Sequence, residues 1–216
     1  MSFYAVANGK TIGIFTNWSE CSESVKGFKN AKYKKFTSLS EAEDFIYSYQ
    51  SENSTSNNFT ADYYVYTDGA CSKNGAVDAL AGIGIFFGID DPRNVSKRIE
   101  GKQTNNVAEL MALIEAFHII QHDIVNNKKI CVVSDSEYAI KCVTTYGKKC
   151  EDKKWNVTIP NKDLVQNAYS LYKDCPNVNV QYVKAHTNSS DCHSIGNYHA
   201  DKLANYSIIH TSNQVI

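Results

Sequence analysis

The order of strand-like and helix-like segments from residue 63 onward constrains the fold of this chain more than any other feature. Three strand-like segments come first: YYVYTDG, ALAGIGIFFG and NVSKRIEG. They are followed by a helix over 104–122, the strand KKICVVSD running into the helical SEYAIKCV, a helix over 164–172, the strand NVNVQYVKAH and a helix over 197–209. Consecutive strands favour hairpins, and strand–helix alternation favours parallel crossovers. This part is therefore predicted to be an α/β domain, a five-stranded mixed sheet flanked by helices.

A polar segment, QSENSTSNNFTAD over 50–62, separates this part from a shorter N-terminal one. It is rich in Ser and Asn and lacks periodicity, which is typical of a flexible linker. Before it, FYAVAN and TIGIFT predict a hairpin, AKYKKF predicts a third strand, and Asn17 and Ser38 each begin a capping box. We therefore expect a small ββαβα domain over 1–49, a linker over 50–62, the α/β domain over 63–210 and a tail over 211–216.

Composition excludes several other classes of protein. With 43% hydrophobic and 21% charged residues, the chain is typical of a folded protein rather than a disordered one. No apolar run approaches the roughly 18 residues of a membrane span, and the N-terminus lacks the pattern of a secretory signal. Seven Cys without a CxxC pair argue for reduced thiols, against a disulfide framework and against structural zinc. The net charge of −1 means that any nucleic-acid binding must come from local patches.

Four acidic residues stand where local structure does not require an acid. Asp68 ends the first strand of the larger part and Asp135 ends the fourth, so parallel pairing would bring both to one edge of the sheet. Glu109 and Asp201 each lie in the first turn of a predicted helix. Converging acids repel one another unless a cation neutralises them, and all-oxygen ligands suit Mg²⁺ or Mn²⁺ better than zinc. Taken singly, each acid also has a structural explanation, as a turn residue, a capping-box partner or a charge at a helix N-terminus.

Five motifs occur in a recognisable order: YTDGACSKNG, QTNNVAELMAL, VVSDSEYAI, VKAH and GNYHADKLA. With them, residues 63–209 resemble the catalytic domain of ribonuclease H type 1. The segments FYAVANGKTIGIFTNWSEC and AKYKKF resemble the RNA–DNA hybrid-binding domain at the head of the eukaryotic-type enzymes. The resemblance implies a hydrolase that cuts the RNA strand of RNA–DNA hybrids and leaves 5′-phosphate and 3′-hydroxyl ends. Alternatives are a non-enzymatic hybrid-binding module, disfavoured because all four acids are present, and a related integrase, disfavoured by the motif series.

The resemblance also implies roles in catalysis. Two Mg²⁺ ions, or Mn²⁺, would activate water and stabilise the leaving oxygen. The residues that would hold them are Asp68, Glu109, Asp135 and Asp201. The mobile His of the family matches His186 in VKAH, where Ala185 replaces the usual Gly. The loop that follows is longer than usual and contains His193, which could take the same role.

By the same resemblance, the larger domain would contact both strands of the hybrid. The amides that would read the minor groove and its 2′-hydroxyls are Asn74, Asn105 and Asn106. A pocket for a DNA-strand phosphate would comprise Lys102, Thr104 and Asn161, with Lys102 where Arg is common. Residues 146–155 resemble the basic protrusion that carries a DNA channel, with Tyr146 and Cys150 where tryptophans are usual and two acids diluting four Lys. Ordinary roles as turn, cap or solvated residues remain open for the amides and for the phosphate pocket.

The small domain matches the hybrid-contacting residues of its family at Tyr4, Trp18, Tyr33, Lys34 and Lys35. Aromatic packing on sugars and Lys–phosphate contacts are a physical basis for sequence-independent binding. Alternatively, Trp18 packs in the core beside Cys21, and the two Lys form a solvated strand edge. We expect a monomer with an RNA–DNA hybrid partner and no membrane partner. Because the hybrid-binding head begins at Phe3, we expect a cytosolic or nuclear location without a mitochondrial presequence.

Overall fold

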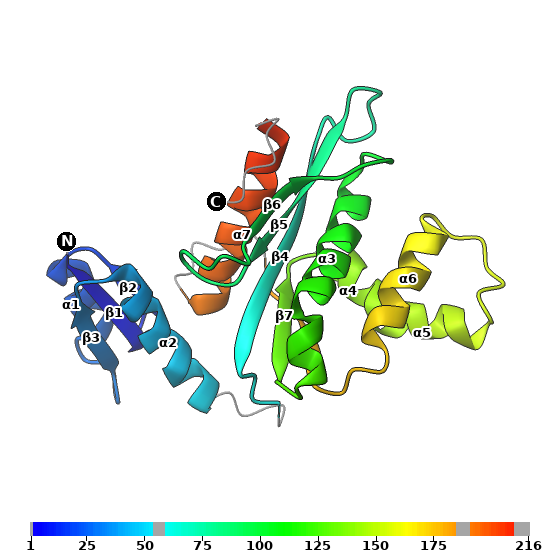
Figure 1. The fold of residues 1–216 in the computed structure, drawn as a ribbon. Helices are drawn as coiled ribbons and strands as arrows, with labels where there is room; N and C mark the ends of the chain where they lie inside the picture. The colour runs from blue at the N-terminus through cyan, green and yellow to red at the C-terminus, as the bar shows by residue number, and fades with distance from the viewer. Residues whose placement is uncertain (1, 54–58, 185–190, 210–216) are drawn as a thin grey trace. The chain divides into compact units, whose positions relative to one another are not determined.

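The structure, a computed structural model, describes residues 2–53, 59–184 and 191–209 (Figure 1). The chain groups into two compact units, one formed by residues 1–60 with 184–195 and the other by 61–183 with 196–216. Among the residues that the structure describes, no helix combines the length and the apolar character needed to cross a bilayer.

The smaller unit contains a three-stranded antiparallel sheet in the order β2-β1-β3. Its elements are β1 (Phe3–Asn8), β2 (Gly13–Phe15), α1 (Trp18–Val25), β3 (Lys32–Phe36) and α2 (Leu39–Asn53). Asn17 caps α1 as the capping box predicts, because its side chain accepts a hydrogen bond of 2.9 Å from the Glu20 N–H. The start of the predicted linker is helical instead, because α2 continues to Asn53. Residues 54–58 of that linker lie outside the described residues.

The larger unit is built on a five-stranded mixed sheet in the order β6-β5-β4-β7-β8, which confirms the predicted architecture (Figure 1). Strands β4, β5 and β6 pair antiparallel, whereas β4, β7 and β8 pair parallel. The strands are β4 (Tyr63–Ser72), β5 (Leu80–Phe86), β6 (Val95–Arg98), β7 (Ile130–Ser134) and β8 (Val178–Tyr182). The helices are α3 (Asn105–Val125), α4 (Glu137–Val143), α5 (Thr145–Asp152), α6 (Lys162–Tyr172) and α7 (Cys192–Ile209).

Strand β4 runs well past the end of its parallel neighbour β7. The last pair between them is Thr67 with Ser134, while β4 continues to Ser72 through its pairing with β5. Asp68 therefore lies inside a strand, and the expectation that β4 ends at the Asp-Gly pair is wrong. The step between the two strands leaves Asp68 unpaired on its β7 side, directly beside the chain that leaves β7 at Asp135.

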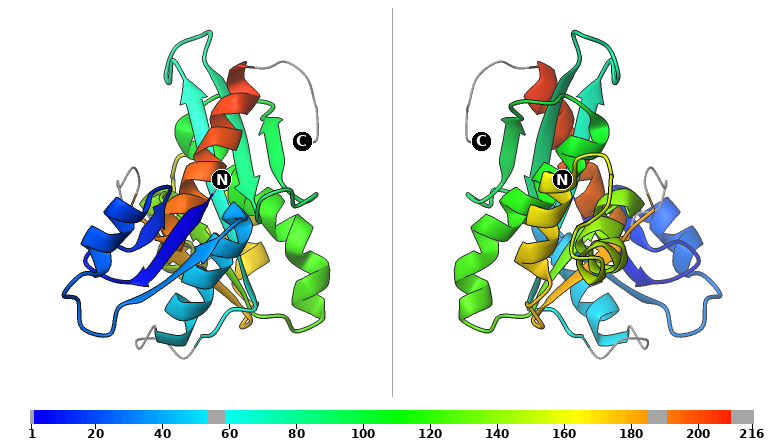
Figure 2. Two further views of the ribbon diagram at one scale, coloured as in Figure 1. Left: turned by 90° about the vertical axis from the view of Figure 1, so that its left-hand side faces the viewer. Right: turned by 90° about the vertical axis from the view of Figure 1, so that its right-hand side faces the viewer.

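Glycines let helices approach both faces of this sheet. A Cβ atom on Gly69 would overlap the α3 backbone at Glu109. On the opposite face, a Cβ on Gly84 would overlap the α7 backbone at Ala200, and one on Gly82 would overlap the Ser207 side chain. Figure 2 shows α3 (green) and α7 (orange to red) on opposite sides of the sheet.

The core of the larger unit surrounds α3, as expected for a helix that is apolar nearly all round. Leu110, Leu113 and Ile120 are fully buried between the sheet and α6. The Tyr172 hydroxyl of α6 donates a hydrogen bond of 2.7 Å to the Leu113 carbonyl oxygen, which ties the two helices together. Burial of this apolar surface is the main source of stability for the unit.

Two helices differ from expectation. Helix α5 was not predicted, since Gly147 in its middle weakens the helical signal; an i,i+4 ion pair of 2.9 Å between Lys148 and Asp152 supports it. Helix α7 begins at Cys192 rather than near residue 197. Its first turn is capped by Asp191, whose carboxylate accepts hydrogen bonds from the N–H groups of His193 and Ser194, both of 3.0 Å.

We predict that Gly69→Ala lowers the free energy of unfolding by about 3 kcal/mol or more, because the added methyl meets backbone that cannot move aside. Urea denaturation of the metal-free protein is the measurement. Gly88→Ala is the matched control, since a Cβ there meets nothing within 4 Å. Equal stability of the two variants would show that α3 does not rest on the sheet as described.

Candidate active site

Three carboxylates meet at the step between β4 and β7. Asp68 comes from β4, Glu109 from α3 and Asp135 from the turn after β7, and one carboxylate oxygen of each lies within 4.8 Å of the other two. Asp68 and Glu109 are each only 6% exposed. We call these three residues the acidic triad. The strand pairing and the contact of α3 at Gly69 bring together residues that are far apart in the sequence.

The electrostatics of the acidic triad are unfavourable without a cation. Burial, with the charges of Asp135 and Asp201, raises the pKa of Asp68 to about 7. Burial and the charges of Asp68 and Asp135 also raise the pKa of Glu109 well above its ordinary value. The Gly69 N–H group lowers both pKa values and offsets only part of this effect.

The donor set of the acidic triad fits a hard divalent cation. All its ligand atoms are carboxylate oxygens, which Mg²⁺ and Ca²⁺ prefer over the nitrogen and sulfur typical of zinc sites. The Glu109 Oε2 atom is buried and has no hydrogen-bond partner among the described residues. An ion held here would satisfy that oxygen and remove the repulsion.

The fourth predicted acid, Asp201, is near the acidic triad but not part of it. Its charge helps to raise the pKa of Asp68, while its Oδ1 accepts a hydrogen bond of 2.9 Å from the Asn205 side chain. Because α7 starts at Cys192, Asp201 lies in the middle of that helix, not in its first turn. Glu109 likewise lies beyond the first turn of α3, which contains no acid.

Of the two candidate histidines, His186 lies outside the described residues. His193 lies in the first turn of α7 and not in the loop where it was expected. Burial lowers the pKa of its imidazole. The imidazole of His193 therefore favours its neutral form.

The three predicted groove amides lie at the N-terminus of α3. Asn74 Oδ1 accepts a hydrogen bond of 3.3 Å from the Asn105 N–H, and Asn105 Nδ2 is 3.5 Å from Glu109 Oε1. Asn106 follows within the same helical turn and is not its cap. Thr104 is the N-cap of α3, since its hydroxyl accepts a hydrogen bond of 3.4 Å from the Val107 N–H. Asn74 and Asn105 thus form a short chain of contacts that ends at the acidic triad.

Two members of the predicted phosphate pocket are in contact: Lys102 Nζ donates a hydrogen bond of 2.9 Å to Asn161 Oδ1. Asn161 precedes α6 in the left-handed conformation, with φ of 54°. Its side chain also bonds to the Tyr138 hydroxyl. The third member, Thr104, is occupied as a helix cap, so the structure joins Lys102 and Asn161 but places Thr104 in a structural role.

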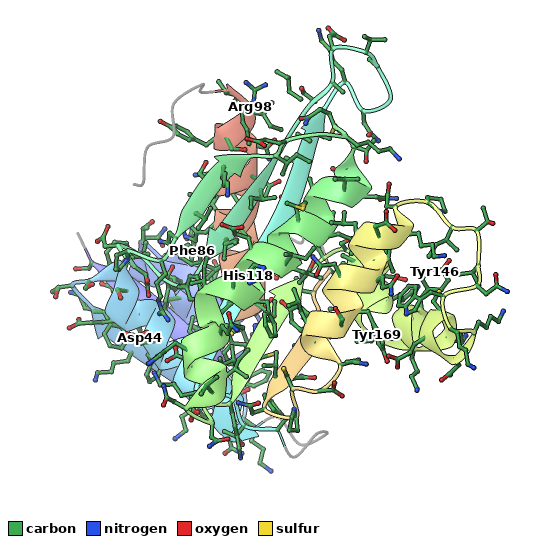
Figure 3. All side chains as sticks on the ribbon, turned by 45° about the vertical axis from the view of Figure 1, so that its right-hand side comes forward. Asp44, Phe86, Arg98, His118, Tyr146 and Tyr169 are labelled. Atoms are coloured by element: carbon green, nitrogen blue, oxygen red, sulfur yellow. The ribbon has the colours of Figure 1, made fainter. Side chains whose placement is uncertain are left out.

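A groove of about 400 Å³ lies between α4 and α5, and Tyr146 and Lys149 of its lining belong to the segment predicted as the basic protrusion. Its lining residues are Tyr138, Lys141, Cys142, Thr145, Tyr146 and Lys149. Tyr146 is visible on α5 in Figure 3, beside α6 with Tyr169. Cys150 is buried, and Trp155 packs against the main core.

The acids of this segment do not line the groove, because they are engaged elsewhere. Asp152 pairs with Lys148 at 2.9 Å, and Glu151 pairs with Lys173 at 2.7 Å. The positive side chains Lys141 and Lys149 therefore reach the groove without an acid in its lining, although Lys141 also pairs with Glu137 at 2.6 Å.

In the smaller unit, three predicted aromatic residues form one cluster, in which Trp18 and Tyr33 are exposed and Tyr4 is half-buried. The rings of Tyr4 and Trp18 are 5.6 Å apart, and those of Trp18 and Tyr33 are 5.9 Å apart. Trp18 is 49% exposed, so its alternative explanation as a core residue is wrong. Lys35 Nζ lies 5.5 Å from the Tyr4 ring centroid. We call Tyr4, Trp18 and Tyr33 the aromatic face.

Lys34 does not belong to the aromatic face. Successive side chains of a strand point to opposite sides of the sheet, and Lys34 Nζ lies 5.2 Å from the Phe36 ring centroid on the α2 side. The structure thus separates two lysines that the sequence motif treats as a pair.

One residue at the site was not predicted from the sequence. Asn197 of α7 donates a hydrogen bond of 2.8 Å from Nδ2 to Asp135 Oδ2. The signal was present, because Asn197 stands four residues before Asp201 and so shares a face of the same helix.

We predict that Asp68→Asn stabilises the metal-free protein by about 2 to 4 kcal/mol at pH 8 and by little at pH 4. A carboxyl group with a raised pKa binds its proton more tightly when folded. The contribution of Asp68 to the free energy of unfolding is therefore lost as pH rises from about 4 through the pKa of about 7. Because Asn does not titrate, the Asp68→Asn variant does not suffer this loss. Urea denaturation in EDTA across this pH range is the measurement.

The control is Asp91→Asn, because hydrogen bonds from Arg93 lower the pKa of Asp91. This variant should be less stable than the parent at pH 8. A pH-independent difference between Asp68→Asn and the parent would contradict the electrostatic account of the acidic triad.

Comparison with known proteins identifies a family for each of the two parts of the chain. The family model for RNase H matches residues 60–209, and the model for the ribonuclease H1 N-terminal domain matches residues 2–46. Ribonuclease H from Schizosaccharomyces pombe is 33% identical, covering 94% of this chain and 96% of the relative. Ribonuclease H1 from Homo sapiens is 27% identical, covering 94% of this chain and 87% of the relative.

Solved structures show the same fold. The PFV RNase H domain superposes with a TM-score of 0.53 at 22% identity, covering 68% of this chain and 94% of its own. LC9-RNase H1, described as a type 1 RNase H with the type 2 active-site motif, gives a TM-score of 0.50 at 25% identity, covering 67% and 71%. The chain therefore belongs to the ribonuclease H family and is a ribonuclease H enzyme that carries the N-terminal domain of ribonuclease H1.

Proposed function

We propose that this protein is an endoribonuclease that hydrolyses the RNA strand of RNA–DNA hybrids with two bound Mg²⁺ ions. The observation that carries the proposal is the acidic triad: three carboxylates from three elements, buried together, with one oxygen left without a partner among the described residues. Like charges are kept together in a core only where a cation or a proton compensates them. The sequence relatives named ribonuclease H1 support the same reaction.

The metal ligands in this proposal are Asp68, Glu109 and Asp135, with Asp201 as the fourth acid beside them. When bound, the two ions supply an activated water and charge stabilisation for the leaving 3′-oxygen, so that cleavage leaves 5′-phosphate and 3′-hydroxyl ends. Because Asp68 retains a proton until pH is about 7, cation binding competes with protonation and strengthens as pH rises through that value.

Recognition of the RNA strand falls to the amides beside the acidic triad. Asn74 and Asn105 carry short side chains that both donate and accept, which suits them to 2′-hydroxyl groups in the shallow minor groove of a hybrid. Since Asn105 also contacts Glu109, the RNA strand would be read directly beside the carboxylates. The Lys102–Asn161 pair and the groove at Tyr146 are suited to phosphates of the DNA strand.

The smaller unit would bind the same kind of duplex without doing chemistry. Its aromatic face offers flat apolar surface for sugars, and Lys35 at its edge offers a charge for phosphate. Contacts of this type carry no base specificity, which is what a binder of hybrids of any sequence requires.

We expect Asp68→Asn and Asp135→Asn each to abolish cleavage, because each removes a charged ligand atom from the acidic triad. The assay compares matched RNA–DNA, RNA–RNA and DNA–DNA duplexes with Mg²⁺, with product ends identified by mass spectrometry. Asp78→Asn, an exposed acid paired with Lys73, is the control and should retain full activity. A parent protein that binds the hybrid and never cleaves it would make the chain a binding module instead.

For the smaller unit, Lys35→Ala should weaken hybrid binding and reduce the slope of log K against log salt by about 1, as expected for one lost phosphate contact. Lys34→Ala should leave that slope unchanged, because Lys34 lies away from the aromatic face. Fluorescence anisotropy at several salt concentrations makes the comparison. Equal losses in the two variants would show that the hybrid contacts both sides of β3.

A further inference from the structure

Asn197 is an amide buried next to the acidic triad. Its side chain belongs to α7 and the residue is only 5% exposed. The Nδ2 group donates a hydrogen bond of 2.8 Å to Asp135 Oδ2, whereas Oδ1 is buried without a partner among the described residues. The amide NH₂ group therefore has a partner in the protein, whereas the amide oxygen has none among the described residues.

The orientation of the amide follows from its neighbour. With Oδ1 turned toward Asp135, two acceptors would face each other at hydrogen-bond distance, which is repulsive when the carboxyl group is ionised. The N–H side must therefore hold Asp135, and the carbonyl side must point elsewhere. The unpartnered oxygen thus follows from the chemistry of the pair.

An unsatisfied buried carbonyl is destabilising, and folded proteins rarely keep one without a partner. In the described part of the chain, two buried side-chain oxygens lack a partner, Asn197 Oδ1 and Glu109 Oε2. One belongs to a member of the acidic triad and the other to a residue bonded to a member. Their coincidence at one place indicates a ligand that satisfies both.

The backbone around Asn197 holds the amide rigidly in place. A Cβ at the preceding Gly196 would overlap the Tyr66 ring, and α7 rests directly on Gly84 of β5 through Ala200. On this fixed backbone, burial of the residue and the hydrogen bond to Asp135 keep the amide in place, so its donor is aligned with Asp135 before any ligand arrives.

We infer that Asn197 is a positioning residue for the metal centre, an inference that rests on the proposed function. Its N–H group fixes the orientation of Asp135, and its Oδ1 accepts a hydrogen bond from a water molecule carried by the bound Mg²⁺. Mg²⁺ in proteins usually retains several of its waters, so an acceptor just outside the ligand set has a natural role. Such outer partners typically contribute 10- to 100-fold to metal affinity or activity.

The test is isothermal titration of Mg²⁺ into the metal-free, substrate-free full chain. Asn197→Ala should bind Mg²⁺ about 10-fold more weakly or worse than the parent. Tyr198→Ala is the matched control on the same helix, since Tyr198 is 53% exposed, and it should bind Mg²⁺ like the parent. Asn197→Ser, which keeps a hydroxyl that donates and accepts, should recover part of the affinity and provides a second variant if the alanine variant folds poorly.

Steady-state cleavage gives an independent measurement. Asn197→Ala should lower kcat at fixed Mg²⁺ while leaving the KM for the hybrid unchanged, and raising Mg²⁺ should restore part of kcat. Unchanged Mg²⁺ affinity together with lower stability in EDTA would overturn the inference and make Asn197 a packing residue. A parent that binds Mg²⁺ without cleaving hybrids would refute the proposed function alone, because the titration still tests Asn197.

Discussion

The site depends on one contact between two backbones, that of α3 at Glu109 and that of β4 at Gly69. Any side chain at position 69 would push the helix away and withdraw the Glu109 carboxylate from Asp68 and Asp135. On the other face, Gly82 and Gly84 allow α7 an equally close approach. The sheet thus packs directly against the backbone of α3 at Gly69 and against α7 at Gly82 and Gly84, next to the place where the acids converge.

The close approach of the buried acids to one another has an energetic consequence. Burial and mutual repulsion raise the pKa values of Asp68 and Glu109, so the metal-free site opposes folding at neutral pH. The opposing stability comes from the core around α3, where fully buried residues such as Leu110, Leu113 and Ile120 meet the sheet and α6. Stability and reactivity therefore come from different parts of one helix, its apolar surface and the single acid near its start.

Much of the fold could be predicted because apolar periodicity is local information. The order of the strands and helices, the mixed sheet and the capping of α1 by Asn17 follow from it. The convergence of Asp68 with Asp135 followed from assuming that their strands are parallel neighbours, which the structure confirms. The predicted extents of two elements were wrong. Pairing with β5 extends β4 beyond the Asp-Gly pair, and this extension leaves no local signal. Helix α7 begins at Cys192 because Asp191 caps it, which is a local signal that the prediction overlooked.

Two features of the sites could have been found with rules already in use. The two-residue period of a strand separates Lys34 from Lys35, although the family resemblance names them together. The four-residue spacing of Asn197 and Asp201 places them on one face of a helix. By contrast, no sequence rule would have found the unpartnered Asn197 oxygen. Its lack of a partner depends on how closely α7 approaches the sheet.

Asn197 and Asp201 both belong to α7, which affects the order in which the parts of the active site are made during translation. The ribosome makes α7 after β4, α3 and β7, so all three residues of the acidic triad are translated before Asn197 and Asp201. At that stage Asp135 has no amide to orient it, and the fourth acid is missing. A prematurely terminated chain would thus carry three of the acids without a finished centre. Nuclease activity would be acquired only after α7 has been made and packs on the glycines of β5.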